Sequence, residues 1–188
     1  MPVTKKTNQS GSRISPALRK KLAGVKLLLC DVDGVLTDAT VFVSEGSETK
    51  QFHIQDGLGQ ILLQKGGIKV GWISNRPSPV TEKRGRELKV DFLFQGKTSK
   101  VAAAEQILEQ VGLTFAQVCY AGDDIVDVGV MKRAGVAIAV INAVAEAKEV
   151  ADYVTEKHGG KGAIREIAEL ILKAQNKWTS VISDYVDK

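Results

Sequence analysis

Two aspartates stand at the end of a short apolar run near the N-terminus. Residues 27–30 read Leu-Leu-Leu-Cys, and Asp31 and Asp33 follow, with Gly34 directly behind. Open α/β sheets place their ligand crevice at the carboxyl ends of strands, so a charged pair there suggests a binding site. Crowded carboxylates need a cation, and a site with few oxygen ligands suits Mg²⁺. The pair therefore predicts a metal-assisted reaction on a phosphate; the alternative is an acidic turn.

The spacing does not fit a calcium-binding loop. Such a loop carries glycine at its sixth position and a glutamate near its end. Counted from Asp31, the glycine here is the fourth residue. Calcium is therefore not favoured.

Two further segments offer groups that hold phosphate. Ser74-Asn75-Arg76 follows the apolar residues 70–73, and its hydroxyl, amide and backbone N–H groups can bind a phosphate oxygen. Lys100 begins a predicted helix, where the helix dipole disfavours a cation, and its position there suggests an anionic partner. An ordinary turn and a solvated lysine are the alternatives for these two segments.

A last acidic group follows the apolar residues 118–121. It comprises Asp123, Asp124 and Asp127. Asp124 and Asp127 are also explained as caps of the next helix, because carboxylates stabilise helix N-termini. That explanation does not account for Asp123, which we therefore predict to be a metal ligand.

Strand and helix patterns alternate along the chain and would position these groups. Predicted strands cover residues 27–30, 69–73, 90–94, 118–121, 136–140 and 152–155. Predicted helices cover residues 16–23, 58–65, 79–88, 99–111, 124–133, 143–150 and 162–177. This alternation predicts an α/β fold with a Rossmann-like parallel sheet and helices on both faces. The polar groups above would then gather at one edge of the sheet.

The domain organisation is simple. We expect a disordered arm over residues 1–13, one domain over residues 14–177, and a tail over residues 178–188. A β-hairpin is predicted over residues 40–54, where two alternating segments flank Ser-Glu-Gly-Ser. It is an insertion after the first strand, and no large cap domain is expected.

The composition favours a small anionic substrate. The formal charge is only +4 and aromatic residues make up 5%, so nucleic-acid binding has little support. Cys30 and Cys119 lie in apolar runs and should be buried, without a zinc or disulfide pattern. No segment resembles a signal peptide or a membrane span. We therefore expect a cytoplasmic protein.

The motifs in this order resemble those of the haloacid dehalogenase-like phosphohydrolases, over residues 26–155. The resemblance implies that Asp31 is the nucleophile, forming an aspartyl-phosphate, and that Asp33 is the general acid and base. Ser74 and Lys100 would hold phosphoryl oxygens. Mg²⁺ would be bound by the Asp31 carboxylate, the Asp33 backbone carbonyl and Asp123.

One branch of that superfamily is more similar, the 3-deoxy-D-manno-octulosonate 8-phosphate phosphatases. The similar segments are residues 31–38, 52–59, 95–96, 122–127, 152–155 and 159–166. The resemblance implies a phosphorylated sugar acid as substrate and a role in lipopolysaccharide biosynthesis. It also implies a homotetramer in which the hairpins pack together and shield neighbouring active sites. Val41, Val43 and Phe52 would be the apolar contacts of that assembly.

Substrate contacts are also implied by the resemblance. They are His53, Ile54, Gln55, Asp56, Gly57, Asn75, Arg76 and Arg84. A guanidinium matches a carboxylate bidentately, and Arg76 is the better placed of the two arginines. Gln55 and Ile61 replace arginines that the family often carries, which weakens the octulosonate assignment. A phosphatase for a nine-carbon keto acid is an alternative, although an acidic residue would be expected there in place of Arg76. A non-catalytic assembly domain is a further alternative, disfavoured by the intact aspartates and lysine.

Overall fold

The computed structural model describes residues 14–186. The predicted arm over residues 1–13 lies outside the described residues. No helix of the described part is long and apolar enough to cross a membrane.

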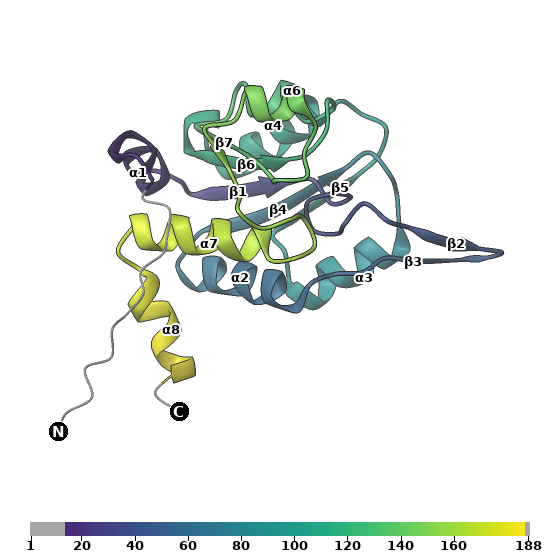
Figure 1. The fold of residues 1–188 in the computed structure, drawn as a ribbon, viewed down its shortest axis with the longest axis horizontal. Helices are drawn as coiled ribbons and strands as arrows, with labels where there is room; N and C mark the ends of the chain where they lie inside the picture. The colour runs from purple at the N-terminus through teal and green to yellow at the C-terminus, as the bar shows by residue number, and fades with distance from the viewer. Residues whose placement is uncertain (1–13, 187–188) are drawn as a thin grey trace.

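A six-stranded parallel sheet forms the centre of the molecule, in the order β5-β4-β1-β6-β7-β8 (Figure 1). The strands are β1 Leu27–Cys30, β4 Lys69–Ser74, β5 Phe92–Gln95, β6 Val118–Gly122, β7 Val136–Ala139 and β8 Tyr153–Val154. The order runs outward in both directions from β1, so the chain reverses direction across the sheet there. The predicted parallel α/β sheet is confirmed.

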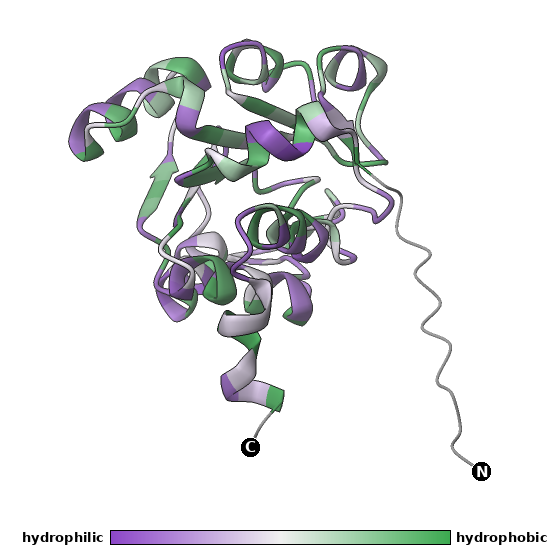
Figure 2. Cartoon of the chain, turned by 90° about the vertical axis from the view of Figure 1, so that its left-hand side faces the viewer, coloured by the Kyte–Doolittle hydropathy of each residue, from purple (hydrophilic) through white to green (hydrophobic). Residues whose placement is uncertain are grey.

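Helices cover both faces of this sheet. They are α1 Pro16–Ala23, α2 Ile54–Lys65, α3 Pro79–Leu88, α4 Lys100–Val111, α5 Val128–Met131, α6 Ala145–Glu149, α7 Ala163–Ala174 and α8 Trp178–Val186, with a 3₁₀ turn η1 at Phe115–Gln117. Figure 1 shows α2, α3 and α7 on one face and α4 and α6 on the other. Between these layers the strands are hydrophobic, whereas the helices are mixed (Figure 2). All four residues of β1 are fully buried.

Two helices begin with a serine cap followed by proline. Ser15 accepts a hydrogen bond from the Leu18 backbone N–H (3.1 Å) and is followed by Pro16. Ser78 caps α3 in the same way through the Thr81 backbone N–H (3.2 Å). A serine cap followed by proline satisfies a free amide and presets the first helical turn.

The hairpin is shorter than predicted. Its strands are β2 Phe42–Ser44 and β3 Ser47–Thr49, and α2 already begins at Ile54. The residues between them turn back to the domain, where the Phe52 ring stacks on Trp72 with centroids 6.2 Å apart. Phe52 therefore packs on its own domain and is half-buried there, and its role in an assembly stays a prediction.

Two other segments differ from the sequence-based prediction. The helix expected over residues 124–133 is reduced to α5, because Asp127 turns inward and binds the backbone of the preceding turn. The expected tail forms α8, in which Val181 is buried and Trp178 and Ile182 pack against the core. Their spacing of three and four residues was a helical signal in the sequence.

The two cysteines are buried and unpaired, as predicted. Burial raises the pKa of both the Cys30 and the Cys119 thiols, so both stay protonated at neutral pH. Cys30 ends β1, and the chemistry of the sheet edge begins with the residue after it.

Candidate active site

The predicted catalytic residues meet at the carboxyl edge of four adjacent strands. Asp31 follows β1, Ser74 ends β4, Lys100 begins α4 after β5, and Asp123 follows β6. In the register of the sheet, Cys30 pairs with Trp72 on one side and with Ala121 on the other. β4 and β6 extend only to Ser74 and Gly122 beyond these partners, so the strand ends bring distant parts of the chain together at one edge.

Three carboxylates form a compact acidic cluster at this edge. Asp31, Asp123 and Asp127 each offer an oxygen, and these oxygens lie within 4.8 Å of one another. Lys100 lies against the cluster, with its Nζ atom 2.8 Å from Asp31 Oδ1 and 2.7 Å from Asp127 Oδ1. One lysine does not neutralise three carboxylates, so the cluster is suited to hold a divalent cation.

The electrostatics of the cluster support the same conclusion. Burial raises the pKa of Asp31 to about 6, although the Lys100 ammonium opposes the shift. Burial, and then the charge of Asp31, raise the pKa of Asp123 to about 8. The Asp123 Oδ1 atom is buried without a hydrogen-bond partner in the described part of the chain. A cation would provide that partner and keep the carboxylates ionised.

Asp127 is a residue whose role the sequence left open. Its side chain is fully buried and accepts hydrogen bonds from the Tyr120 hydroxyl (2.6 Å) and the Asp123 backbone N–H (3.1 Å), besides its ion pair with Lys100. Asp127 therefore shapes the turn that carries Asp123. Asp124 is exposed, and its carboxylate accepts a hydrogen bond from the neighbouring Ile125 backbone N–H (2.7 Å).

Glycine at position 34 allows Asp123 to approach the first loop. Gly34 has a φ of +103°, and a Cβ atom there would lie 1.9 Å from Asp123 Oδ2. The loop is held from outside by Asn142, whose Nδ2 donates to the Gly34 carbonyl (3.1 Å) and whose Oδ1 accepts from the Gly159 N–H (2.7 Å). The loop geometry thus depends on residues more than 100 positions away.

Asp33 lies apart from the acidic cluster. Its carboxylate is paired with Lys50, whose Nζ atom is 2.7 Å from Oδ1 and 2.9 Å from Oδ2. We did not predict Lys50, because a lysine next to a hairpin strand usually extends into solvent. The alternation of Glu48 and Lys50 was the only available signal, since it places both on one face.

The loop after β4 is bound to the hairpin. Ser74 is buried, and its hydroxyl accepts from the Arg76 backbone N–H and donates to the Arg76 carbonyl, both at 3.1 Å. Arg76 pairs with Glu48 of β3 at 2.6 Å, and Ser78 also hydrogen-bonds to Glu48. Asn75 is exposed. The predicted carboxylate-binding arginine is therefore engaged by a carboxylate of its own chain.

The other predicted substrate residues lie around the start of α2. Asp56 is buried and accepts from the backbone N–H groups of Gly162 (3.1 Å) and Arg165 (2.8 Å), so it caps α7. Gly57 leaves room for Arg84, because a Cβ atom there would lie 2.6 Å from Arg84 Nη2. Within this chain, the Asp56 carboxylate thus stabilises the fold by capping α7.

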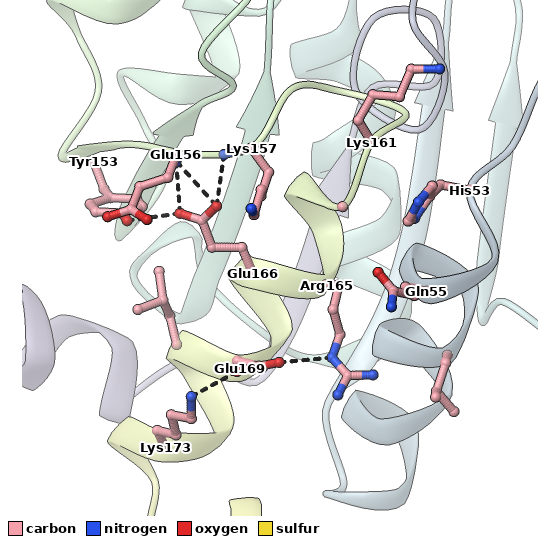
Figure 3. A pocket seen from close by; sticks show the side chains of 13 residues that line it. His53, Gln55, Tyr153, Glu156, Lys157, Lys161, Arg165, Glu166, Glu169 and Lys173 are labelled. Carbon is pink, nitrogen blue, oxygen red and sulfur yellow. Dashed lines mark hydrogen bonds and ion pairs between the residues drawn. The ribbon is translucent and has the colours of Figure 1, made fainter. Parts of the chain in front are cut away.

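His53 and Gln55 line a different hollow, between α2 and α7. It has a volume of about 520 Å³, and none of the catalytic aspartates lines it. Figure 3 shows His53 and Gln55 on one wall, Glu156 and Lys157 on the other, and Arg165 between them. Ile54 is 75% exposed. Within a single copy of the chain, His53 and Gln55 therefore line a hollow separate from the acidic cluster.

Comparisons with known proteins agree with this geometry. Residues 77–167 match the family described as haloacid dehalogenase-like hydrolase. The 3-deoxy-D-manno-octulosonate 8-phosphate phosphatase of Haemophilus influenzae is 39% identical over 161 residues, covering 85% of this chain and 89% of that protein. That of Salmonella typhimurium is 37% identical, covering 87% and 88% of the two chains.

Solved structures give the same result. The Moraxella catarrhalis phosphatase of the same name, in complex with magnesium, phosphate and KDO, superposes with a TM-score of 0.86 at 38% identity, covering 89% of this chain and 97% of that one. The cobalt-bound Haemophilus influenzae enzyme gives 0.81 at 40% identity, covering 84% and 92%.

The fold and the site define a haloacid dehalogenase-like phosphohydrolase. The chain belongs to the 3-deoxy-D-manno-octulosonate 8-phosphate phosphatase family within that class. It is accordingly a phosphoric monoester hydrolase.

Proposed function

We propose that this protein is a Mg²⁺-dependent phosphatase that hydrolyses 3-deoxy-D-manno-octulosonate 8-phosphate. The observation that carries the proposal is the acidic cluster held against Lys100 at the carboxyl edge of the sheet. The Moraxella catarrhalis relative, with magnesium, phosphate and KDO bound, supports the choice of metal and substrate.

The residues present fit a magnesium ion. Asp31 and Asp123 would bind it through their carboxylates and Asp33 through its backbone carbonyl. Asp127 already accepts bonds from Lys100, Tyr120 and the backbone, so it supports the site. Bound Mg²⁺ would screen the repulsion between the carboxylates and a phosphate dianion.

The reaction would proceed in two steps on Asp31. An Asp31 oxygen attacks phosphorus, the bond from phosphorus to the sugar oxygen breaks, and Asp33 gives its proton to the leaving alkoxide. Asp33 then takes a proton from water, which attacks phosphorus and releases phosphate and free Asp31. Lys100 and Ser74 would hold phosphoryl oxygens during both steps.

Recognition of the sugar acid is assigned to Arg76. Its pairing with Glu48 shows that its side chain accepts a carboxylate partner in this loop. A substrate carboxylate would replace Glu48 there. His53 and Gln55 would contribute only in an assembly, since they line a hollow that none of the residues of the acidic cluster lines.

We further infer that the protein assembles as a homotetramer through its hairpins. Phe42 and Val43 are 68% and 75% exposed on a hairpin that projects from the domain (Figure 1). Apolar side chains in that position normally meet a partner.

A second candidate is a phosphatase for a nine-carbon keto acid phosphate. Gln55 and Ile61 leave it open, because each stands where the octulosonate family often has an arginine. Arg76 opposes it, because a phosphatase for nine-carbon acids is expected to carry an acidic residue there. A non-catalytic role is disfavoured, since Asp31, Asp33, Lys100 and Asp123 are all intact.

A substrate panel tests these alternatives. Phosphate release would be measured for the eight-carbon and nine-carbon acid phosphates and for simple hexose phosphates, each with Mg²⁺ and with excess chelator. We expect the highest kcat/KM for the eight-carbon substrate and no turnover without metal. Metal-independent release, or none with any substrate, would contradict the proposal.

A further inference from the structure

The ammonium group of Lys50 lies in the interior of the protein. The side chain has no exposed surface, although the residue follows a hairpin whose tip is open to solvent. Thr49, its neighbour, is exposed, so the alternation along the strand directs Glu48 and Lys50 toward the domain. A lysine next to an exposed hairpin could extend its ammonium group into water at little cost, but Lys50 does not.

Burying an ammonium group is unfavourable unless all its protons find acceptors. Lys50 donates hydrogen bonds to Asp33 Oδ2 (2.9 Å) and Thr81 Oγ1 (3.3 Å), and its Nζ atom also lies 2.7 Å from Asp33 Oδ1 in an ion pair. One carboxylate and one hydroxyl thus compensate the buried ammonium group.

Asp33 depends on this contact for its orientation. Among the described residues, Lys50 is the only partner of the Asp33 carboxylate, which remains 23% exposed. Asp31 and Asp127, by contrast, are fixed by Lys100, and Asp127 also by Tyr120. Without Lys50, the Asp33 side chain would be free to rotate toward solvent.

We propose that Lys50 is a positioning residue for Asp33, holding its carboxylate where it exchanges protons with the leaving group and with water. The proposal rests on the phosphatase function argued above. It gives the base of the hairpin a part in the chemistry as well as in assembly.

The competing explanation is that Lys50 only anchors the hairpin. Glu48 already provides such an anchor through Arg76 and Ser78. Anchoring the hairpin does not require that the Lys50 ammonium contact Asp33, the carboxylate that lies outside the acidic cluster. The two explanations differ in which step of catalysis Lys50 supports.

The test uses Lys50→Met, which keeps the length and apolar stem of the side chain. With p-nitrophenyl phosphate, the leaving nitrophenolate needs no proton, so phosphorylation of Asp31 should remain fast. Hydrolysis of the aspartyl-phosphate still needs Asp33 as a base. Rapid mixing should therefore show a burst of about one nitrophenolate per active site, followed by turnover about 10²-fold below wild type, the lower end of general acid–base effects.

With the sugar-acid phosphate, both steps need Asp33. We expect a similar fall in kcat, an unchanged KM and no burst of free sugar. Lys83→Met, at an exposed position on α3, is the matched control and should behave as wild type. Should Lys50→Met prove unfolded by circular dichroism, Thr81→Val removes the third contact of Lys50 and should give a smaller fall with the same burst.

A double variant shows whether Lys50 acts through Asp33. In an Asp33→Asn background, adding Lys50→Met should cause no further loss, because residues acting as a unit are not additive. A further loss, an equal loss of burst and turnover, or wild-type kinetics of Lys50→Met would each overturn the inference. If Asp33→Asn itself turned over normally, the proposed mechanism would fail instead.

Discussion

At the scale of single residues, the site is a balance of charges around Asp31. The Lys100 ammonium bridges the carboxylates of Asp31 and Asp127, and Asp123 completes the acidic cluster. A nucleophile in this position must be anionic, partly desolvated and still able to approach a phosphate dianion.

Replacing Asp31 with Asn should abolish turnover. An amide cannot form the aspartyl-phosphate, so we expect a fall on the order of 10⁴-fold or more, as for other essential nucleophiles. The fold should survive, because the change relieves repulsion within the acidic cluster. Steady-state kinetics and a thermal melt check the two parts. Near-normal activity in a preparation free of other phosphatases would refute the mechanism.

Magnesium binding should strengthen as the pH rises from about 6 to above 8. The pKa of Asp123, raised to about 8 by burial and by Asp31, means that the metal-free site holds a proton that the cation must displace. The same shift makes the metal-free protein lose stability as the pH rises through that range, since the folded state binds more protons than the unfolded one.

Titration calorimetry at several pH values measures this effect. Buffers of different ionisation enthalpy would report the protons released on Mg²⁺ binding. Asp123→Asn is the control, and it should bind Mg²⁺ weakly with little pH dependence. Affinity independent of pH in the wild type would show that Asp123 is already ionised.

Arg76→Ala should distinguish binding of the substrate's carboxylate from binding of its phosphate. Loss of one charge-assisted contact costs about 2–3 kcal/mol, so we expect KM for the sugar-acid phosphate to rise far more than KM for p-nitrophenyl phosphate, which has no carboxylate. Arg86→Ala, on the exposed side of α3, is the control. Equal losses on both esters would place Arg76 on the phosphoryl group.

At the scale of elements, the strand ends and their polar residues could be predicted from sequence. An apolar run that stops at Asp31, at Ser74 or at Asp123 predicts a buried strand. It also predicts that the polar residue lies in the site, because parallel strands end at one edge of the sheet. The Lys50–Asp33 pair and the capping role of Asp56 could not be predicted, since each joins residues through tertiary packing. The length of the helix that became α5 was overestimated for a similar reason. The inward side chain of Asp127 holds the backbone before it in a turn.

Gly34→Ala tests how closely two of these strand ends approach. The new Cβ atom would overlap Asp123 Oδ2 at 1.9 Å and would also sit at a φ of +103°. We expect loss of Mg²⁺ binding and a backbone penalty of about 1–3 kcal/mol. Gly46→Ala is a matched control, because its φ is +73° but no atom lies within 4 Å of its Cβ position. Equal effects of both variants on metal binding would show that backbone strain, and not the carboxylate, is responsible.

At the scale of the whole molecule, the domain has two features that a single copy does not use. The hairpin presents Phe42 and Val43 to solvent, and His53 and Gln55 face a hollow away from the acidic cluster. A two-stranded hairpin is marginally stable by itself, which supports the proposed assembly through its projecting tip. Assembly would also exclude water from a site that has no cap domain of its own.

Replacing both Phe42 and Val43 with Lys should therefore yield smaller species and a lower kcat/KM together. Charges at two apolar contacts oppose association, whereas the isolated domain keeps its core because both side chains are exposed in the single chain. Light scattering coupled to size exclusion gives the mass, and assays on the separated species give the activity. Replacing Gln106 and Gln110 of α4 with Lys is the control, because it adds the same charge at exposed positions outside the hairpin. If the wild type is a monomer with full activity, neither the interface nor a shared site exists.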